Sequence, residues 1–292
     1  MFVENQALKP FVVNRSVQEE YQANGKGVNV SIILKKMGIS NTALGFLGGF
    51  TGNYIEDELK RIGVDTDFIG IEGITRINTF VKVGREEYKI VNKGPTVLIE
   101  KSEEILGKIN CMTSGDFLIV SGSTPQGVGE GIYLEIAKIA KRKGIQLILD
   151  ISSKILLDCL AYNPYLIKPN DEELASFFNK EEVTDGDIVQ LGKELLSMGS
   201  ENVLISKGEK GATFLSKEKV LSVNSPKGKV VNTACAGDSL LAAFIGRLQL
   251  GDTIEEALVC ASAIGASTAF TTGLSDLQDV SKLMEEIKIT KL

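Results

Sequence analysis

Four short apolar segments constrain the fold of this chain more than any other feature of its sequence. They span residues 116–123, 146–150, 166–170 and 202–206, and each ends in a polar residue. Segments with the apolar spacing of helices occur between them. Because strands and helices alternate in this way in parallel sheets with crossover helices, the sequence predicts an α/β fold with a mostly parallel central sheet.

Polar side chains stand where these predicted strands end. They are Ser121, Asp150, Lys168, Asn170 and Ser206. Ligands of open parallel sheets bind beyond the carboxyl ends of the strands. The sequence therefore predicts that the functional site lies along this edge of the sheet.

The N-terminal part of the chain alternates in the same manner. Residues 28–37 have helical spacing, residues 43–47 read as a strand, and residues 54–62 read as a second helix. The turn Asn24-Gly25-Lys26-Gly27 precedes the first helix and places a lysine between two glycines. Glycine at both sides of a lysine permits close approach of the backbone to a ligand, although most turns of this kind are only turns.

A hairpin pattern interrupts this alternation. Residues 77–83 alternate between apolar and polar, residues 84–87 form a turn, and residues 88–91 read as a returning strand. The first ~23 residues also read as extended structure. We expect segments at about 10–23 and 75–95 to form a small sheet that acts as a lid, within a single domain spanning residues 1–292.

The absence of histidine from all 292 residues limits the chemistry of the protein. It excludes Ser-His-Asp and Cys-His triads, acid–base catalysis by histidine and histidine-ligated metals. The four cysteines have no paired spacing, which indicates a reducing compartment and argues against a zinc site. Any chemistry must rely on Asp, Glu, Lys, Arg, Cys, Ser or Tyr, or on a bound hard cation.

Charge and hydropathy indicate a cytoplasmic protein with small-molecule ligands. The net charge of −6 argues against a nucleic-acid partner, whose phosphates require a basic surface. No apolar run approaches the ~20 residues of a membrane span. The start of the chain has neither the basic region nor the apolar core of a signal peptide.

One stretch near the C-terminus combines small residues with a carboxylate. Residues 229–239 lead through Cys235-Ala236-Gly237 to Asp238, and an apolar run with helical spacing follows. Free amides at a helix start favour an anion, so a carboxylate there suggests a base that accepts a proton from an attacking hydroxyl. The alternative is that Asp238 is an ordinary N-cap, and the stretch alone does not decide between the two.

Two residue pairs have functional interpretations and plainer alternatives. Asn170 and Glu173 lie three apart at a helix start, where they either form a capping box or orient magnesium-bound water. Arg76 and Asn78 lie two apart in the predicted lid, where they face solvent or hold a substrate phosphate. The glycine turn at 207–211 is a further candidate phosphate site. No GxxxxGK[ST] or GxGxxG pattern occurs, so Walker-type and dinucleotide-binding sites have no support.

The order of these motifs resembles that of the PfkB (ribokinase-like) family of sugar kinases over essentially the whole chain. Residues 24–29 are similar to the first family signature, residues 168–173 match KPNxxE, and residues 234–239 resemble the second signature. Residues 75–78, 94–95 and 121–123 resemble the branch that acts on phosphorylated ketohexoses, which includes 1-phosphofructokinase and tagatose-6-phosphate kinase. The resemblance implies a three-layer α/β/α fold with a small β-sheet lid.

The resemblance also implies an activity and a role for each matching residue. It implies phosphorylation of fructose 1-phosphate to fructose 1,6-bisphosphate with ATP and Mg²⁺, with tagatose 6-phosphate as the alternative substrate. Asp238 would be the general base, and the amides of Cys235, Ala236 and Gly237 would form the anion hole. Gly25, Lys26, Asn29, Arg76 and Asn78 would bind the sugar phosphate. ATP would be bound by Lys168, Asn170, Glu173, Ser206, Gly208 and Gly211. Asn170 and Glu173 would also hold magnesium through water. Residues 263–272 would lie near the adenine.

Three departures from the family pattern accompany the resemblance. The chain has no counterpart of the family's opening core strand, for which truncation or a misplaced start is the simplest explanation. Cys235 and Asn24 each replace a glycine, and a cysteine at positive φ adds strain of about 1–3 kcal/mol. A catalytically impaired sugar-phosphate-binding protein is therefore a second hypothesis. An NAD-linked oxidoreductase is a third and weaker one, and a homodimer through the lid is a further expectation.

Overall fold

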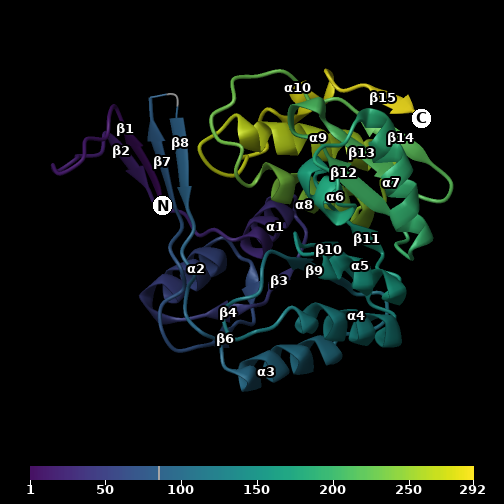
Figure 1. Cartoon of the computed structure of the whole chain (residues 1–292), viewed down its shortest axis with the longest axis horizontal. Helices are drawn as coiled ribbons and strands as arrows, with labels where there is room; N and C mark the ends of the chain where they lie inside the picture. Colours follow the sequence, from purple (N-terminus) through teal and green to yellow (C-terminus); the bar gives the residue numbers. More distant parts are fainter. Residues whose placement is uncertain (85) are drawn as a thin grey trace.

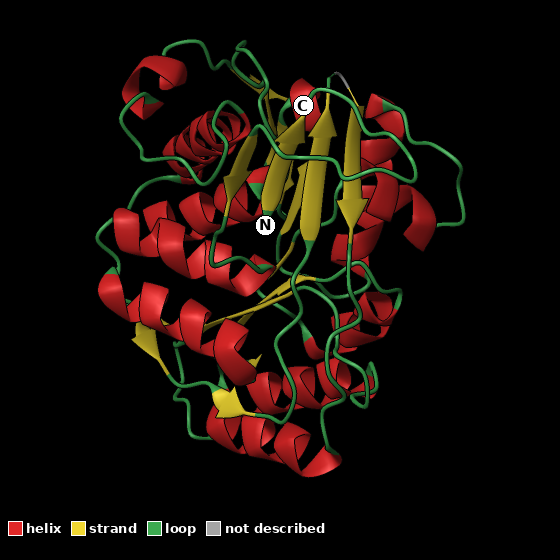
Figure 2. Cartoon of the chain, turned by 90° about the vertical axis from the view of Figure 1, so that its left-hand side faces the viewer, coloured by secondary structure: helices red, strands yellow, loops and turns green. Residues whose placement is uncertain are grey.

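A twisted sheet of seven strands forms the centre of the computed structural model, which describes residues 1–84 and 86–292 (Figures 1 and 2). The order of its strands is β15-β14-β13-β12-β11-β10-β9. Neighbours from β9 to β12 pair in parallel, and neighbours from β12 to β15 pair antiparallel. The bounds are β9 (Phe117–Ser121), β10 (Gln146–Asp150), β11 (Leu166–Ile167), β12 (Val203–Ser206), β13 (Ala212–Leu215), β14 (Val220–Val223) and β15 (Ile289–Lys291). The four strands predicted from apolar segments are thus β9 to β12.

Helices cover both faces of this sheet, as the predicted three layers require (Figure 2). Consecutive side chains of β10 point to opposite faces: Ile148 packs in one apolar core, and Leu147 and Leu149 pack in another. The first core includes residues of α1 (Lys26–Lys36), α8 (Ala236–Gln249), α9 (Ile254–Ala269) and α10 (Val280–Met284). The second includes residues of α3 (Ile99–Asn110), α4 (Gly131–Lys143), α5 (Ile155–Cys159), the short helix η1 (Leu160–Tyr162), α6 (Asp171–Phe177) and α7 (Asp185–Ser197).

A separate four-stranded sheet, here called the lid, stands beside this body (Figure 1). Its strands, in the order β2-β1-β7-β8, are β2 (Gln18–Glu20), β1 (Phe2–Asn5), β7 (Thr79–Val83) and β8 (Glu86–Ile90). The predicted hairpin is the antiparallel pair β7–β8, and Arg85 in its turn lies outside the described residues.

The lid differs from the expected segments in its N-terminal part. Residues 2–5 supply a strand that lies outside the range 10–23, and within that range only Gln18–Glu20 is a strand. Phe11 and Val13 are exposed in the intervening loop. A weak alternation of apolar residues therefore did not locate the strands, because the position of a strand depends on the partner that pairs with it.

Four short strands from the N-terminal part of the chain lie beside β9, the edge strand of the central sheet (Figure 1). The predicted strand over 43–47 divides into β3 (Thr42–Ala43) and β4 (Phe46–Leu47), which pair in parallel with β5 (Asp65–Thr66) and β6 (Ile69–Gly70). Helix α2 (Gly49–Arg61) follows β4. A groove of about 330 Å³, lined by Leu44, Phe46, Leu118 and Val120 among others, lies between β4 and β9. The five residues of β9 are only half-buried as a result.

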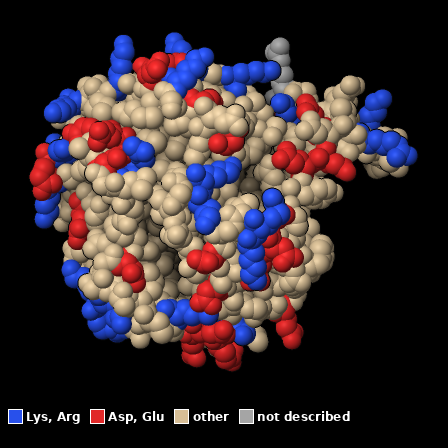
Figure 3. Space-filling view, turned by 180° about the vertical axis from the view of Figure 1, so that it is seen from behind, with Lys and Arg blue, Asp and Glu red and all other residues tan. Residues whose placement is uncertain are grey.

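The surface carries charges of both signs. Figure 3 shows Lys and Arg side chains interspersed with Asp and Glu over one whole face of the molecule, which also has a hollow near its middle. In the part of the chain that the structure describes, each helix is too short or too polar to cross a membrane.

Candidate active site

The start of α8 carries the predicted catalytic carboxylate. Cys235 is the N-cap residue, with φ 69°, and no side chain caps the helix there. Asp238 lies three residues further on and is 7% exposed. Its Oδ2 accepts a hydrogen bond of 2.8 Å from Nδ2 of Asn29 in α1. The alternative that Asp238 is an N-cap is therefore wrong, because its carboxylate contacts a different helix.

The surroundings of Asp238 raise its proton affinity. Burial raises the pKa of Asp238 to about 6, and the nearby Asp150 carboxylate adds to this. The hydrogen bond from Asn29 and the charges of Lys26 and Lys168 act in the opposite direction. A carboxylate with a pKa near 6 is mostly ionised at neutral pH and is better matched to accepting a proton than an ordinary aspartate.

The amides of Ala236 and Gly237 open α8, where backbone N–H groups have no partner within the helix. The backbone N–H of Ala236 makes a long contact of 3.4 Å with the carbonyl of Thr233. Cys235 has a left-handed backbone conformation, which glycine adopts without strain, and Nδ2 of Asn24 lies 3.3 Å from its Sγ. Burial raises the pKa of the Cys235 thiol to about 11, so it stays neutral.

Two lysines share one buried carboxylate next to this helix start. Nζ of Lys26 and Nζ of Lys168 each lie 3.1 Å from Oδ1 of Asp150, whose side chain is fully buried. A Cβ on Gly237 would lie 3.6 Å from Nζ of Lys168, so this ammonium group adjoins the start of α8. Burial alone would lower the pKa of Lys26, but the carboxylates of Asp150, Glu173 and Asp238 together raise it.

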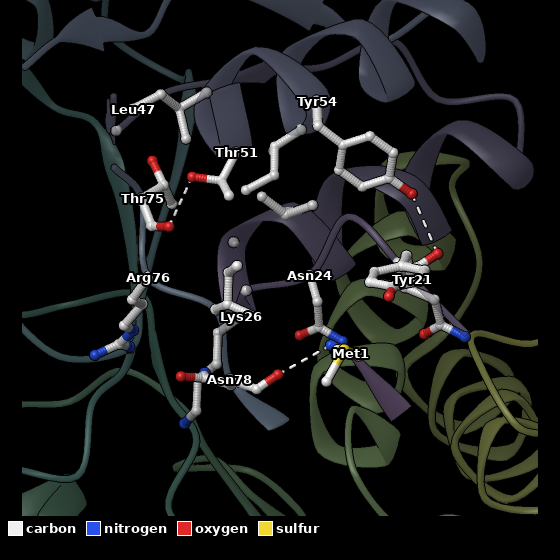
Figure 4. A pocket seen from close by; sticks show the side chains of 18 of the residues that line it. Met1, Tyr21, Asn24, Lys26, Leu47, Thr51, Tyr54, Thr75, Arg76 and Asn78 are labelled. Carbon is white, nitrogen blue, oxygen red and sulfur yellow. Dashed lines mark hydrogen bonds between the residues drawn. The ribbon is translucent and has the colours of Figure 1, made fainter. Parts of the chain in front are cut away.

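A cavity of about 580 Å³, here called the main cavity, lies between α2, the lid and the start of α1 (Figure 4). The residues that line it include Gly25, Lys26, Arg76 and Asn78, for which substrate binding is a prediction from the sequence. The sequence suggested that Arg76 and Asn78 lie on a strand. In the structure they belong instead to the segment that precedes β7. Asn29 is 1% exposed and is not among the lining residues. Asn29 therefore contacts Asp238 and does not line the cavity.

Hydrogen bonds from α2 hold the segment that carries Arg76. Oγ1 of Thr51 donates to the backbone oxygen of Thr75 over 2.7 Å (Figure 4). The amide of Gly48, just before α2, donates to Oγ1 of Thr75 over 2.9 Å. In Figure 4, Arg76 lies on one side of Lys26, and Tyr21 and Tyr54 lie on the other. The main cavity thus has a cationic end and an aromatic end.

The predicted nucleotide residues lie at the ends of β11 and β12. Asn170 and Glu173 form a capping box at the start of α6, so the structural alternative for this pair is confirmed. Glu173 also accepts a hydrogen bond of 2.6 Å from Ser152. Asn170 lies beside Ser206 as a parallel bridge. The two carboxylate oxygens of Glu173 are already hydrogen-bonded, so this pair would bind a cation through water rather than directly.

Gly208 and Gly211 form a tight turn, η2 (Gly208–Lys210), after β12. Both have positive φ, and a Cβ on Gly211 would collide with the backbone oxygen of Val223. Of residues 263–272, Thr272 lines the main cavity and Ala263 is fully buried. In the described residues there is no cluster of three or more metal-ligating side chains. The oxygen donors of Asn170 and Glu173 suit Mg²⁺, which keeps several of its waters.

Two residues next to the predicted site were not assigned from the sequence. Asn24 contacts both Cys235 and Asn29, and its only sequence signal is that it replaces a glycine of the first signature. Ser152 contacts Glu173, and it lies just beyond the end of a predicted strand. Such a position was a usable signal, because strand ends were already expected to line the site.

A buried carboxylate lies at a helix start here, beside two ammonium groups and near a large cavity under a lid, and this arrangement suits phosphoryl transfer to an alcohol group. Residues 2–280 match the pfkB family carbohydrate kinases, and the chain belongs to this family. The family and the ribokinase-like fold expected from the sequence are therefore confirmed.

Proteins with similar sequences include kinases named for sugar phosphates. The chain is 51% identical to D-tagatose-1-phosphate kinase from Bacillus licheniformis, over all of this chain and 96% of that protein. It is 36% identical to 1-phosphofructokinase from Bacillus subtilis, over 96% of this chain and 92% of that protein. Among solved structures it is similar to phosphofructokinase-2 from Escherichia coli in complex with substrates and products, with a TM-score of 0.91, 28% identity and coverage of 97% and 94%.

Proposed function

We propose that this protein uses ATP to phosphorylate the free terminal hydroxyl of a ketohexose 1-phosphate, with D-tagatose 1-phosphate as the preferred substrate. The observation that carries the chemistry is the buried Asp238 at the start of α8, with its pKa raised to about 6. The 51% identity to a tagatose-1-phosphate kinase supports the choice of sugar.

In this proposal the substrate lies in the main cavity with its phosphate at the cationic end. The guanidinium of Arg76 binds the phosphate through two N–H groups, and Asn78 and Gly25 line the same space. The free terminal hydroxyl of the sugar points toward the start of α8, on the side of the cavity that Ala234 lines, and from there reaches Asp238. A ketohexose monophosphate fits this arrangement because its phosphate and its free terminal hydroxyl are at opposite ends of the molecule.

Asp238 accepts the hydroxyl proton as the sugar oxygen attacks the terminal phosphorus of ATP. One P–O bond forms to the sugar, the P–O bond to ADP breaks, and the proton ends on Oδ1 or Oδ2 of Asp238. The amides of Cys235, Ala236 and Gly237 donate hydrogen bonds to the oxygens of the transferred group, and the nearby ammonium of Lys168 offsets its charge. Asn29 keeps the carboxylate aimed at the site.

The ATP phosphates lie beyond β11 and β12 in this proposal. Asn170 and Glu173 would hold Mg²⁺ through water, and the turn at Gly208 and Gly211 would approach the nucleotide with its backbone beside Ser206. Bound magnesium supplies charge neutralisation of the phosphate oxygens. The cytoplasmic location stays a prediction.

Fructose 1-phosphate, which the sequence suggested as the main substrate, is the second candidate, and tagatose 6-phosphate, its alternative there, is the third. Relatives named 1-phosphofructokinase and tagatose-6-phosphate kinase support them at 36% and 32% identity. The strained Cys235 at the anion hole favours the other alternative, a protein that binds sugar phosphate with impaired turnover.

A homodimer through the lid is also part of the proposal. Strand β8 is exposed along its described residues, and Tyr88 and Ile90 are about half exposed. An exposed sheet of this kind offers an apolar face to a second copy. The structure of E. coli phosphofructokinase-2 in its inhibited form is tetrameric, which is a property of that protein.

An ADP-release assay with Mg²⁺ tests the proposal. Tagatose 1-phosphate, fructose 1-phosphate, tagatose 6-phosphate and fructose 6-phosphate are offered in parallel, and the product of each is identified by NMR. The highest kcat/KM is expected for tagatose 1-phosphate. Higher kcat/KM for a 6-phosphate would overturn the assignment of the sugar, and saturable binding without ADP release would favour the binding protein.

A further inference from the structure

We propose that Asp150 is a positioning residue, which holds the ammonium groups of Lys26 and Lys168 at the two sides of the phosphoryl-transfer site. This inference rests on the proposed kinase function. Asp150 is the last residue of β10 and its side chain is fully buried, yet it touches neither the main cavity nor a predicted nucleotide residue other than Lys168.

The first argument is geometric. Oδ1 of Asp150 lies 3.1 Å from Nζ of Lys26 and 3.1 Å from Nζ of Lys168. Lys26 comes from the first turn of α1 and lines the main cavity, whereas Lys168 follows β11 and adjoins Gly237. One carboxylate oxygen therefore links a cation on the sugar side to a cation on the anion-hole side.

The second argument concerns the charges. Lys168 is 5% exposed at its side chain, and Lys26 is 34% exposed. Two ammonium groups that contact the same oxygen atom, one of them buried, repel each other unless an anion lies between them. Asp150 is that anion. It keeps both ammonium groups in place, and the two lysines with one aspartate leave a net positive charge for the phosphoryl group.

The third argument concerns the second carboxylate oxygen. Oδ2 of Asp150 is buried and has no hydrogen-bond partner in the described part of the chain. A structural ion pair ordinarily satisfies both oxygens. The charge of Asp150 also acts on Asp238, whose pKa is raised by Asp150 and lowered by Lys26 and Lys168. The other ionisable groups near these residues are Cys235, beside Asp238, Glu173, whose charge acts on Lys26, and Lys89, whose charge acts on Cys235.

A carboxyl titration tests this coupling without turnover. The protein is labelled with carboxyl-¹³C aspartate, and the Asp238 signal is identified by its loss in Asp238→Asn. Asp150→Asn is expected to move the titration midpoint of Asp238 to lower pH, and Lys26→Met to move it to higher pH. Asp116→Asn, which removes an exposed carboxylate at the opposite end of the adjacent strand, is the control and should leave it unchanged.

Kinetics test the positioning itself. Asp150→Asn is expected to lower kcat by about tenfold or more, since displaced catalytic groups lose rate steeply. Its acid limb in the pH–rate profile should move to lower pH than that of the wild type. The substrate phosphate also titrates near pH ~6, but it does so equally in every variant. In the Lys26→Met, Lys168→Met background the same substitution should have much less effect, because the groups it positions are gone.

Each outcome decides the inference. Two results would contradict the inference and leave Asp150 as a structural ion pair. One is that Asp150→Asn does not change the titration midpoint of Asp238. The other is that Asp150→Asn lowers kcat by the same factor whether or not the two lysines are present. If Asp150→Asn does not fold, Asp150→Glu takes its place: it keeps the charge, but its longer side chain should displace the two ammonium groups and lower kcat, and an unchanged kcat would overturn the inference. Absence of turnover in the wild-type protein would overturn the proposed kinase and would leave the carboxyl titration to decide the coupling.

Discussion

Asn29 and Asp238 are 209 positions apart in the sequence and are joined by a buried hydrogen bond of 2.8 Å. Asn29 lies in α1 and Asp238 in α8, and the two helices pack against each other in one apolar core. The bond stabilises the ionised carboxylate while burial disfavours it, and burial prevails. The orientation and the basicity of the proposed base therefore depend on a residue outside the cavity.

Asp238→Asn should abolish most phosphoryl transfer. An amide cannot accept the hydroxyl proton, so kcat is expected to fall about 10²–10⁴-fold. Substrate binding, measured by calorimetry, should be kept, because Asn29 can still donate to the amide oxygen. A rate equal to that of the wild type would contradict the assignment of Asp238 as the base.

The same substitution should stabilise the protein at neutral pH. The pKa of Asp238 is raised from its ordinary 3.8 to about 6, so the folded state binds this proton more tightly than the unfolded state. Protonated Asp238 therefore contributes its whole stabilisation below the pKa of the unfolded state, and this stabilisation is lost as the pH rises through the folded-state pKa of about 6. Asn removes this loss, and the free energy of unfolding at pH 7.5 should rise by roughly 2–3 kcal/mol at most. Melting curves at pH 4 and 7.5 should show the gain only at the higher pH.

Asn29→Ala should move the acid limb of the pH–rate profile to higher pH. The hydrogen bond from Asn29 lowers the pKa of Asp238, so its loss raises that pKa further. Asn41→Ala is a suitable control, because Asn41 donates to backbone oxygens near the other end of α1. An unchanged profile in Asn29→Ala would mean that Asp238 does not control the acid limb.

Cys235→Gly should increase thermal stability. Cys235 has φ 69°, a conformation that costs a residue with a Cβ about 1–2 kcal/mol and that glycine adopts freely. The contact with Asn24 is lost, so the net gain is expected to be about 1 kcal/mol. Cys111→Gly is the matched control: its φ is −81°, and glycine should destabilise the protein there. A lower melting temperature for Cys235→Gly would show that the Asn24 contact outweighs the strain.

Arg76→Ala should raise KM for the sugar phosphate far more than it lowers kcat. Loss of a charged hydrogen-bond donor to the phosphate is expected to raise KM roughly 10–100-fold. Arg76→Lys should restore only part of this, since lysine cannot bind in a bidentate manner. Arg15→Ala, in the exposed loop of the lid, should change neither parameter. Equal effects of the two alanine variants would remove Arg76 from the proposed phosphate site.

Glu173→Gln should separate the capping role of this residue from its proposed role in magnesium binding. Glutamine at this position also completes a capping box, so the melting temperature should change little. The Mg²⁺ concentration needed for half-maximal rate should rise, because the negative charge is lost. Glu172→Gln, on the exposed side of the same turn, is the control. An unaltered Mg²⁺ requirement would leave Glu173 with the capping role alone.

The sequence allowed the body of the fold to be predicted better than the lid. Ile148 and its neighbours are apolar at every position because both sides of their strand are buried, and such runs identify a parallel strand without further information. Phe2 and Val3 carried no comparable signal. They form a strand because β7 lies alongside them, and a pairing across so many residues is not encoded locally.

The candidate site shows the same division. Asp238, Lys26 and Arg76 were recognised because their motifs are local. Asp150 was noted only as a strand end, since its two lysine contacts come from segments that meet in the folded chain. The capping box of Asn170 was foreseen as an alternative, because spacing alone implied it.

The parallel pairing of β1 with β7 has a consequence for synthesis of the chain. Phe2 leaves the ribosome first, but its partner Phe80 follows about 80 residues later, roughly 4–16 s at bacterial rates of elongation. Throughout that interval β1 can pair only with β2, and its other edge stays open to unrelated chains. We therefore expect nascent chains arrested before residue 79 to bind holdase chaperones more strongly than chains that extend past β8.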